Sequence, residues 1–274
     1  MDEIVGVGPT DELNLRVSAA TLARVLFPNP DDGRLMLALE RKATWVEKDR
    51  ETHFIHRVQP FGGAVRINDT NKLREIIGEF HFDSLKSRDE HDFRILINPD
   101  GWSSLREFTI EAFRVRDSPH IESDPTRELV EEFNDTIGLA LKSSQYELRA
   151  GGIVLENEPR PTRNVHASGN LTVRVYKIYE AGIMDPSLSR AIIKNSLGHS
   201  EERLQRQAEE NAREKGRGWA NAILAAPLDE VQAAYAGTPP ERRKDPVPFA
   251  GTYLDGNVSA VLEDVEVPSY QRIF

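Results

Sequence analysis

The sequence predicts a mixed α/β (α+β) protein, and two observations lead to this class. Short apolar runs bounded by turn residues recur along the chain, and segments with helical spacing lie between them. The chain has 274 residues, of which 39% are hydrophobic and 29% charged, a composition typical of a globular protein with a core.

The N-terminal part of the chain contains three strand candidates. Residues 13–27 are rich in Val, Leu and Ala and end in a turn containing Pro and Asp. Residues 34–41 follow that turn, so the two segments are expected to form a hairpin. Residues 53–67 alternate in part and contain Gly62 and Gly63, which indicate a bend or a close approach of two backbones.

The remaining elements follow from the same patterns. Further strands are expected at 93–97, 146–155 and 171–179, and helices at 72–80, 102–113, 186–195 and 201–225. The tail after residue 239 is polar and Pro-rich at first and offers at most short strands.

Composition excludes several functional classes. The chain has no cysteine, which rules out disulfides, thiolate catalysis and Cys-based zinc sites. A net charge of −10 argues against binding long nucleic acid, which requires clustered Lys and Arg. No apolar run is long enough to cross a membrane, and the acidic start lacks signal-peptide features, so a cytoplasmic location is expected. The acidic charge still allows small phosphorylated ligands to bind if a metal supplies positive charge locally.

Residues 124–138 form the most informative segment. Asp124 suits an N-cap, Pro125 the first helical position, and Gly138 the position after the last turn. At about 100° per residue, the acidic side chains fall on one stripe of this helix and the apolar ones on an adjoining stripe. The acidic stripe holds Glu128, Glu131, Glu132 and Asp135, and the apolar stripe holds Leu129, Val130, Phe133 and Ile137.

Two acidic pairs on this helix, Glu128/Glu132 and Glu131/Asp135, are four residues apart and repel one another. Arg127 is placed to offset this repulsion only through Glu131. A hard divalent cation would remove it, because such cations prefer carboxylate oxygens. A solvated acidic face is the alternative, and spacing alone leaves both interpretations open.

The order Arg127-Glu128-Leu129-Val130-Glu131-Glu132 resembles the second half of the Nudix box, G-x5-E-x7-R-E-U-x-E-E-x-G-U, with U aliphatic. The resemblance implies an α/β/α sandwich with a mixed sheet that hydrolyses nucleoside diphosphates linked to another group. It makes Glu128, Glu131 and Glu132 ligands of magnesium or manganese, or the base that activates water. Arg127 would orient these glutamates, and Gly63 would be the first glycine of the box.

The chain departs from this box in three ways. Gly63 and Arg127 are 64 positions apart, so an insertion over about 68–121 splits the box. The first glutamate has no clear counterpart, since Asp69 has the right distance from Gly63 but the wrong identity, and Glu122 is too close to Arg127. Asn134 stands where the box has its last glycine.

A branch of the superfamily matches this split layout better. The run HFIHRVQPFGGA at 53–64, an insertion and a late REL-x-EE helix resemble the SMODS-associated Nudix domain, over approximately residues 13–180. Such domains accompany nucleotide signalling enzymes in bacterial anti-phage defence, where nucleotide sensing or hydrolysis is their proposed role. The expected organisation is a Nudix-like domain over 1–182 and a mainly helical C-terminal extension with a tail over 183–274.

Several functional hypotheses follow. The first is metal-dependent hydrolysis of a phosphoanhydride, with Glu131, Glu132 and Arg127 as catalytic residues and Arg57, Gly62, Gly63 and Arg163 contacting substrate. The second is a nucleotide-sensing module that has lost catalysis, as the missing first glutamate indicates. A third is a purely structural partner that uses the C-terminal helices, and those helices are also the expected surface for a homodimer.

Overall fold

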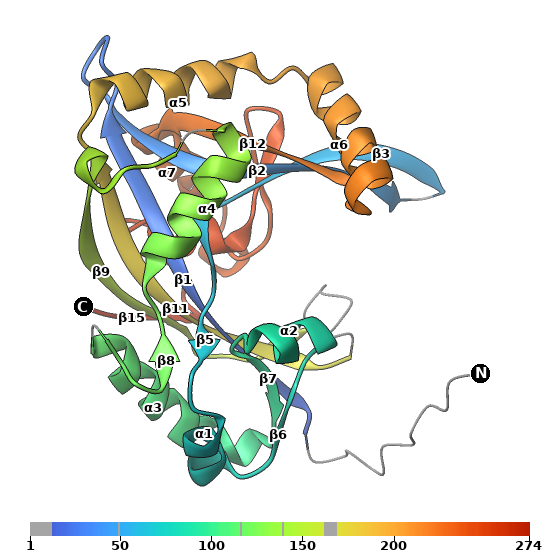
Figure 1. Cartoon of the computed structure of the whole chain (residues 1–274), viewed down its shortest axis with the longest axis vertical. Helices are drawn as coiled ribbons and strands as arrows, with labels where there is room; N and C mark the ends of the chain where they lie inside the picture. Colours follow the sequence, from blue (N-terminus) through green and yellow to red (C-terminus); the bar gives the residue numbers. More distant parts are fainter. Residues whose placement is uncertain (1–12, 49, 116, 139, 162–168) are drawn as a thin grey trace.

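The computed structural model describes residues 13–48, 50–115, 117–138, 140–161 and 169–274, with only the backbone of Lys48, Glu128 and Ile137. Strands and helices are mixed along the chain, as predicted, and most strands join one large curled sheet (Figure 1). No helix in these ranges is both long enough and apolar enough to cross a bilayer.

Fifteen strands and seven α-helices are present in the described ranges. The strands are β1 (Leu15–Pro28), β2 (Leu35–Lys48), β3 (Glu51–Gln59), β4 (Phe61–Ala64), β5 (Arg66–Ile67), β6 (Phe80–Phe82), β7 (Arg94–Ile97), β8 (Ile121–Glu122), β9 (Tyr146–Glu156), β10 (Arg160–Pro161), β11 (Leu171–Ile183), β12 (Trp219–Pro227), β13 (Val247–Phe249), β14 (Thr252–Leu254) and β15 (Tyr270–Ile273). The helices are α1 (Thr70–Ile77), α2 (Leu85–Glu90), α3 (Trp102–Arg114), α4 (Pro125–Ile137), α5 (Pro186–Gly198), α6 (Glu201–Lys215) and α7 (Leu228–Ala236). Short 3-10 turns are η1 (Pro99–Gly101), η2 (Ser143–Gln145), η4 (Pro240–Arg242) and η5 (Gly256–Val261).

Strand β1 is the centre of the sheet. One of its edges pairs in parallel with β11 from Leu15 to Leu26, and its other edge pairs in turn with β7, β4 and β2. The predicted hairpin of β1 and β2 is confirmed at the Pro28 end. The bend expected near Gly62 and Gly63 is also confirmed, because the chain passes there from β3, which pairs with β2, to β4, which pairs with β1.

The two faces of the sheet bury different helices, since neighbouring residues of a strand point to opposite faces. Met36 and Ala38 of β2 pack in one core with residues of α4 and α5, whereas Leu37 and Leu39 pack in another with Val231 and Tyr235 of α7. Helix α4 therefore lies on one face of the sheet, and α7 lies on the other (Figure 1).

The segment between β5 and β8 packs as a compact lobe. It contains α1, β6, α2, β7 and α3, and β7 adds to the edge of β1. Its two ends meet where β5 pairs with β8, and the backbone nitrogen of Asn68 donates to the carbonyl of His120 over 2.9 Å. A buried ion pair, Arg16 Nη2 to Asp83 Oδ2 at 2.6 Å, fastens the lobe to β1.

The C-terminal third differs from the mainly helical extension expected over 183–274. Helix α5 and helix α6 are present, but the helix predicted to reach residue 225 ends at Lys215, where Gly216 adopts a left-handed conformation (φ 64°). The apolar residues that follow form β12, which pairs with β2, and β14 and β15 pair with β3 and β9. Strand pairing across the chain thus overrode the local helical pattern, and this region completes the same sheet.

Candidate functional site

Helix α4 begins and ends where the sequence predicted. The Asp124 side chain accepts a hydrogen bond from the backbone nitrogen of Thr126 at 2.8 Å, and Pro125 occupies the first turn. Gly138 is left-handed (φ 65°), and its N–H donates to the carbonyl of Asn134. The Asp124 cap, Pro125 and Gly138 act locally, and for this reason their positions in the sequence were sufficient to place the helix.

The apolar stripe of α4 fixes the helix on the sheet. Leu129 and Phe133 are 1% and 0% exposed, and the Phe133 ring lies 4.8 Å from the ring of Phe61 on β4. This packing leaves Glu131 exposed and Glu132 half-buried at the β4 side of the helix. The side chain of Glu128 lies outside the described part of the structure.

Three hydrogen bonds hold Ser123, the residue that precedes the cap of α4. Thr21 Oγ1 and Tyr179 Oη each donate to its carbonyl at 3.2 Å, and Lys177 Nζ donates to its Oγ at 2.9 Å. Burial lowers the pKa of Lys177. These partners lie on β1 and β11, between 54 and 102 positions away, and no sequence pattern connects them to α4.

Glu132 binds the backbone of the paired glycines. Its Oε2 accepts a hydrogen bond from the backbone nitrogen of Gly62 at 2.6 Å. Gly62 has φ 141°, and a Cβ there would lie 2.0 Å from the carbonyl oxygen of Thr21, so the close approach of β4 to β1 requires glycine. Gly63 pairs with Thr21 in the same ladder. The structure therefore brings Glu132 of the acidic stripe to the strand that holds Gly62 and Gly63.

Arg127 lies between two carboxylates. Its Nη1 is 3.3 Å from Glu131 Oε2, and its Nε is 3.5 Å from Glu122 Oε1. Glu122 reaches this place because β8 pairs with β5 across the base of the lobe, where Arg66 Nη1 also lies 3.7 Å from Glu122 Oε2. The short sequence distance between Glu122 and Arg127 argued against Glu122 as the first glutamate of the box.

Asp69 belongs to a different environment. It caps α1 by accepting from the backbone nitrogen of Lys72 at 2.9 Å, and its Oδ2 is 3.3 Å from His120 Nδ1. Hydrogen bonding, first of all from Lys72, lowers the pKa of Asp69. Of the two acidic residues considered for the first glutamate of the box, Glu122 and not Asp69 therefore lies beside Arg127.

The donor chemistry of the site suits a hard divalent cation. Glu131 and Glu132 offer carboxylate oxygens from adjacent positions on one helix, and such oxygens are the ligands that magnesium and manganese prefer. Among the side chains that the structure describes, no three His, Asp or Glu groups are arranged to chelate a metal. Glu128, the third ligand that the Nudix resemblance implies, is not among those side chains.

Arg57 does not join the carboxylates of α4. It lines a cavity of about 560 Å³ with residues such as Glu156, Arg174 and Lys244, and no described residue of α4 contributes to that cavity. The nearby His56 is buried, and its Nδ1 accepts a 3.2 Å hydrogen bond from Arg41 Nε. Arg163, the remaining substrate-binding candidate, lies outside the described residues.

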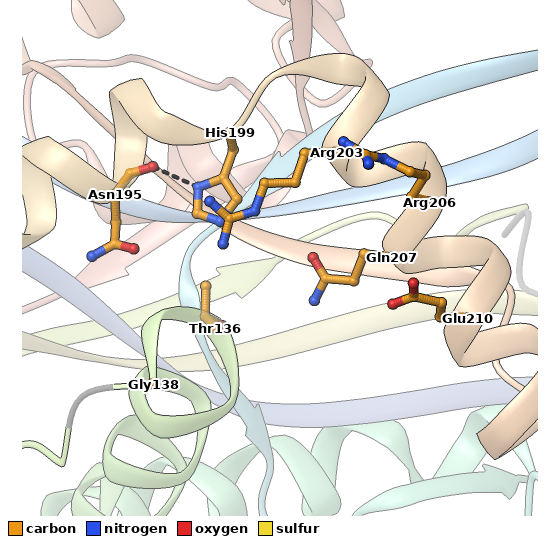
Figure 2. Close-up of a pocket in the computed structure, with 8 residues that line it drawn as sticks. All are labelled: Thr136, Gly138, Asn195, His199, Arg203, Arg206, Gln207 and Glu210. Atoms are coloured by element: carbon orange, nitrogen blue, oxygen red, sulfur yellow. Dashed lines mark hydrogen bonds between the residues drawn. The ribbon is translucent and has the colours of Figure 1, made fainter.

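A second cavity, of about 630 Å³, opens at the C-terminal end of α4 (Figure 2). Thr136 and Gly138 form its floor, and the C-terminal end of α5 and one side of α6 form its walls. Thr136 follows Glu132 by one helical turn, so this cavity continues the acidic stripe along the helix axis. Helix α6 has nearly equal numbers of acidic and basic residues.

The site as a whole combines three carboxylates held in fixed directions with the backbone of the paired glycines. Glu132 is held by a backbone N–H, and Glu131 and Glu122 are held by one guanidinium. Such a site can bind a cation and place it beside the Gly62 backbone of β4. When the chain was compared with protein-family models, curated proteins and solved structures, none of them matched it.

Proposed function

We propose that this protein is a metal-dependent hydrolase of the Nudix type that cleaves a phosphoanhydride in a nucleotide or nucleotide derivative. The observation that carries the proposal is the 2.6 Å hydrogen bond between Glu132 Oε2 and the Gly62 nitrogen. It joins the two halves of the split motif, the glycine pair and the REL-x-EE helix, into one site. The SMODS-associated branch is the proposed subfamily, with anti-phage nucleotide signalling in the cytoplasm as the proposed role.

Each residue has a defined part in this proposal. Glu128, Glu131 and Glu132 would hold magnesium or manganese, which when bound supplies the positive charge that polarises phosphate oxygens and acidifies water. Gly62 fixes the direction of the Glu132 carboxylate, and Arg127 orients Glu131 and Glu122. One of these glutamates accepts the proton of the attacking water. Gly63 leaves the backbone open for a phosphate to approach.

A nucleotide-sensing module without catalysis is the second candidate. It is favoured by Asp69, which has the spacing of the first box glutamate but is committed to the cap of α1. In this case the same carboxylates would bind a metal–nucleotide complex without activating water. A homodimer formed through residues 183–274 is compatible with both candidates.

The test compares wild type with Glu131→Gln and Glu132→Gln on nucleoside triphosphates, dinucleoside polyphosphates, ADP-ribose and cyclic oligonucleotides, each with magnesium or manganese. Glu111→Gln, an exposed change on α3, is the matched control. Metal-dependent turnover that is lost in both α4 variants and kept in the control supports the hydrolase. A rise in melting temperature with ligand, without turnover, supports the sensor and contradicts the catalytic roles.

A further inference from the structure

The cavity at the end of α4 is lined by two arginines of helix α6. Arg203 and Arg206 extend from α6 and are exposed (Figure 2). Their hydrogen bonds are long ones to backbone carbonyls, 3.5 Å from Arg203 Nη1 to Gly198 and 3.4 Å from Arg206 Nε to Glu202. Within the described part of the chain, neither guanidinium lies in a salt bridge. In a protein of net charge −10, such a pair of cations at one cavity can attract an anionic ligand.

His199 adds a hydrogen-bond acceptor to the same wall. Its Nδ1 lies 2.5 Å from the carbonyl oxygen of Asn195 (Figure 2), and because a carbonyl only accepts, Nδ1 must carry the proton. Burial, together with the nearby charge of Arg203, lowers the pKa of His199, so the ring is neutral at pH 7. A neutral ring protonated at Nδ1 has an acceptor at Nε2.

The other lining groups suit a ligand that has both phosphate and polar ring atoms. Gln207 and Glu210 extend from α6 toward the end of α4 (Figure 2), which adds an amide and a carboxylate to the two guanidinium groups. Thr136 is 6% exposed, and its Oγ1 has no hydrogen-bond partner among the described residues. Because this oxygen is buried, the polar groups that a ligand in the cavity can contact come from the walls and not from the Thr136 hydroxyl.

The spacing along α4 between the carboxylates and the cavity floor is short enough for one extended ligand to reach both. Thr136 follows Glu132 by four residues and Glu128 by eight, which along a helix axis correspond to about 6 Å and about 12 Å. This spacing along α4 is short enough for a nucleotide with one phosphate on the metal proposed at Glu132 to place a more distant phosphate in the cavity. Guanidinium groups are suited to that contact, because their planar donors match phosphate oxygens in pairs.

We propose that the cavity between the end of α4 and α6 binds the distal phosphate of a nucleotide polyphosphate, with Arg203 and Arg206 as its cationic contacts. This inference rests on the proposed function, since it assigns the near phosphate to the metal that the carboxylates of α4 would hold. It makes nucleoside polyphosphates the substrate class and predicts that nucleoside monophosphates, which cannot span both places, bind weakly.

The test measures dissociation constants for ATP, ADP, AMP and adenosine by calorimetry in magnesium buffer. Variants are Arg203→Ala, Arg206→Ala and the double change, with Arg213→Ala as control, because Arg213 lies on the same helix and makes a similar 3.3 Å bond to the backbone of Glu209. Each single change should weaken ATP binding by about tenfold, the double change by more, and adenosine binding should stay unchanged. The difference in ATP dissociation constant between wild type and the double variant should become smaller at high salt.

The outcomes separate this inference from the proposed function. If the double variant binds ATP as tightly as wild type, the inference is wrong, even if Glu132-dependent hydrolysis is present. If affinity falls as expected but no phosphoanhydride is cleaved, the cavity is a polyphosphate site and the hydrolase proposal fails. A wild type that binds none of the phosphate ligands overturns the inference as well. Arg203→Gln and a melting curve for each variant exclude loss of folding as the cause.

Discussion

The carboxylate of Glu132 accepts a 2.6 Å hydrogen bond from the backbone nitrogen of Gly62, although 70 positions separate the two residues. This bond closes a motif that the intervening lobe divides in the sequence. The lobe does not disturb the contact, because its two ends meet in the short ladder of β5 and β8. An insertion between adjacent strand ends can therefore grow without moving the residues on either side of it.

The first prediction concerns the strength of this contact. Glu132→Gln keeps an acceptor oxygen for the Gly62 N–H and should change the free energy of unfolding little. Glu132→Ala leaves the N–H without its acceptor and should lower that free energy by about 1–3 kcal/mol. Urea unfolding of both variants measures the difference, and equal stability of the two would show that the bond does not hold α4 in place.

The second prediction concerns Gly62 itself. Gly62→Ala should lower the free energy of unfolding by more than about 3 kcal/mol, because the new Cβ meets the Thr21 carbonyl and the backbone is held at φ 141°. Gly218→Ala is the control, since a Cβ there meets nothing within 4 Å and φ is not in the left-handed range. Thermal unfolding compares them. A stable Gly62→Ala protein would mean that β4 does not approach β1 so closely.

The third prediction concerns which carboxylate replaces the first glutamate of the box. If the hydrolase proposal holds, Glu122→Gln should lower kcat by tenfold or more, because Glu122 shares Arg127 with Glu131. Asp69→Ala should leave kcat unchanged and lower the free energy of unfolding through loss of the α1 cap. Steady-state kinetics and urea unfolding of both variants decide this, and the reverse pattern would assign the role to Asp69.

The fourth prediction concerns the buried pair Arg16–Asp83. Burial would raise the pKa of Asp83, but hydrogen bonds from Ser87 and Arg16 outweigh it and leave that pKa below its usual value. Asp83→Asn leaves the Arg16 charge buried and uncompensated, so it should lower the free energy of unfolding by about 3–5 kcal/mol. Glu147→Gln, which breaks an exposed pair with Arg149, should cost less than about 1 kcal/mol.

The same pair sets a pH dependence. Because the pKa of Asp83 is lower in the folded protein, its contribution to stability is complete above the unfolded-state pKa of about 3.9 and is lost as pH falls through the folded-state value. Urea unfolding between pH 3 and pH 7 should show this loss in wild type and a smaller one in Asp83→Asn. If the free energy of unfolding falls equally with pH in both proteins, Asp83 is not the source of this loss.

The sequence by itself determined those features that depend on neighbouring residues. Asp124, Pro125 and Gly138 predicted both ends of α4, and apolar runs bounded by turn residues predicted β1, β9 and β11. Caps, proline and left-handed glycine act within one turn of a helix, and the apolar stripe of a strand follows from its own pleat. The acidic stripe and its neighbouring Leu129 and Phe133 could be read in the same way.

Only the tertiary structure decided the features that depend on distant pairing. The residues after Gly216 were expected to continue a helix but form β12, because the open edge of β2 offers them a ladder of hydrogen bonds. The β5–β8 ladder brings Glu122 to Arg127, and the course of β3 takes Arg57 to another cavity. Each of these outcomes depends on which strands become neighbours, and that is set by burial across the whole chain and not by local pattern.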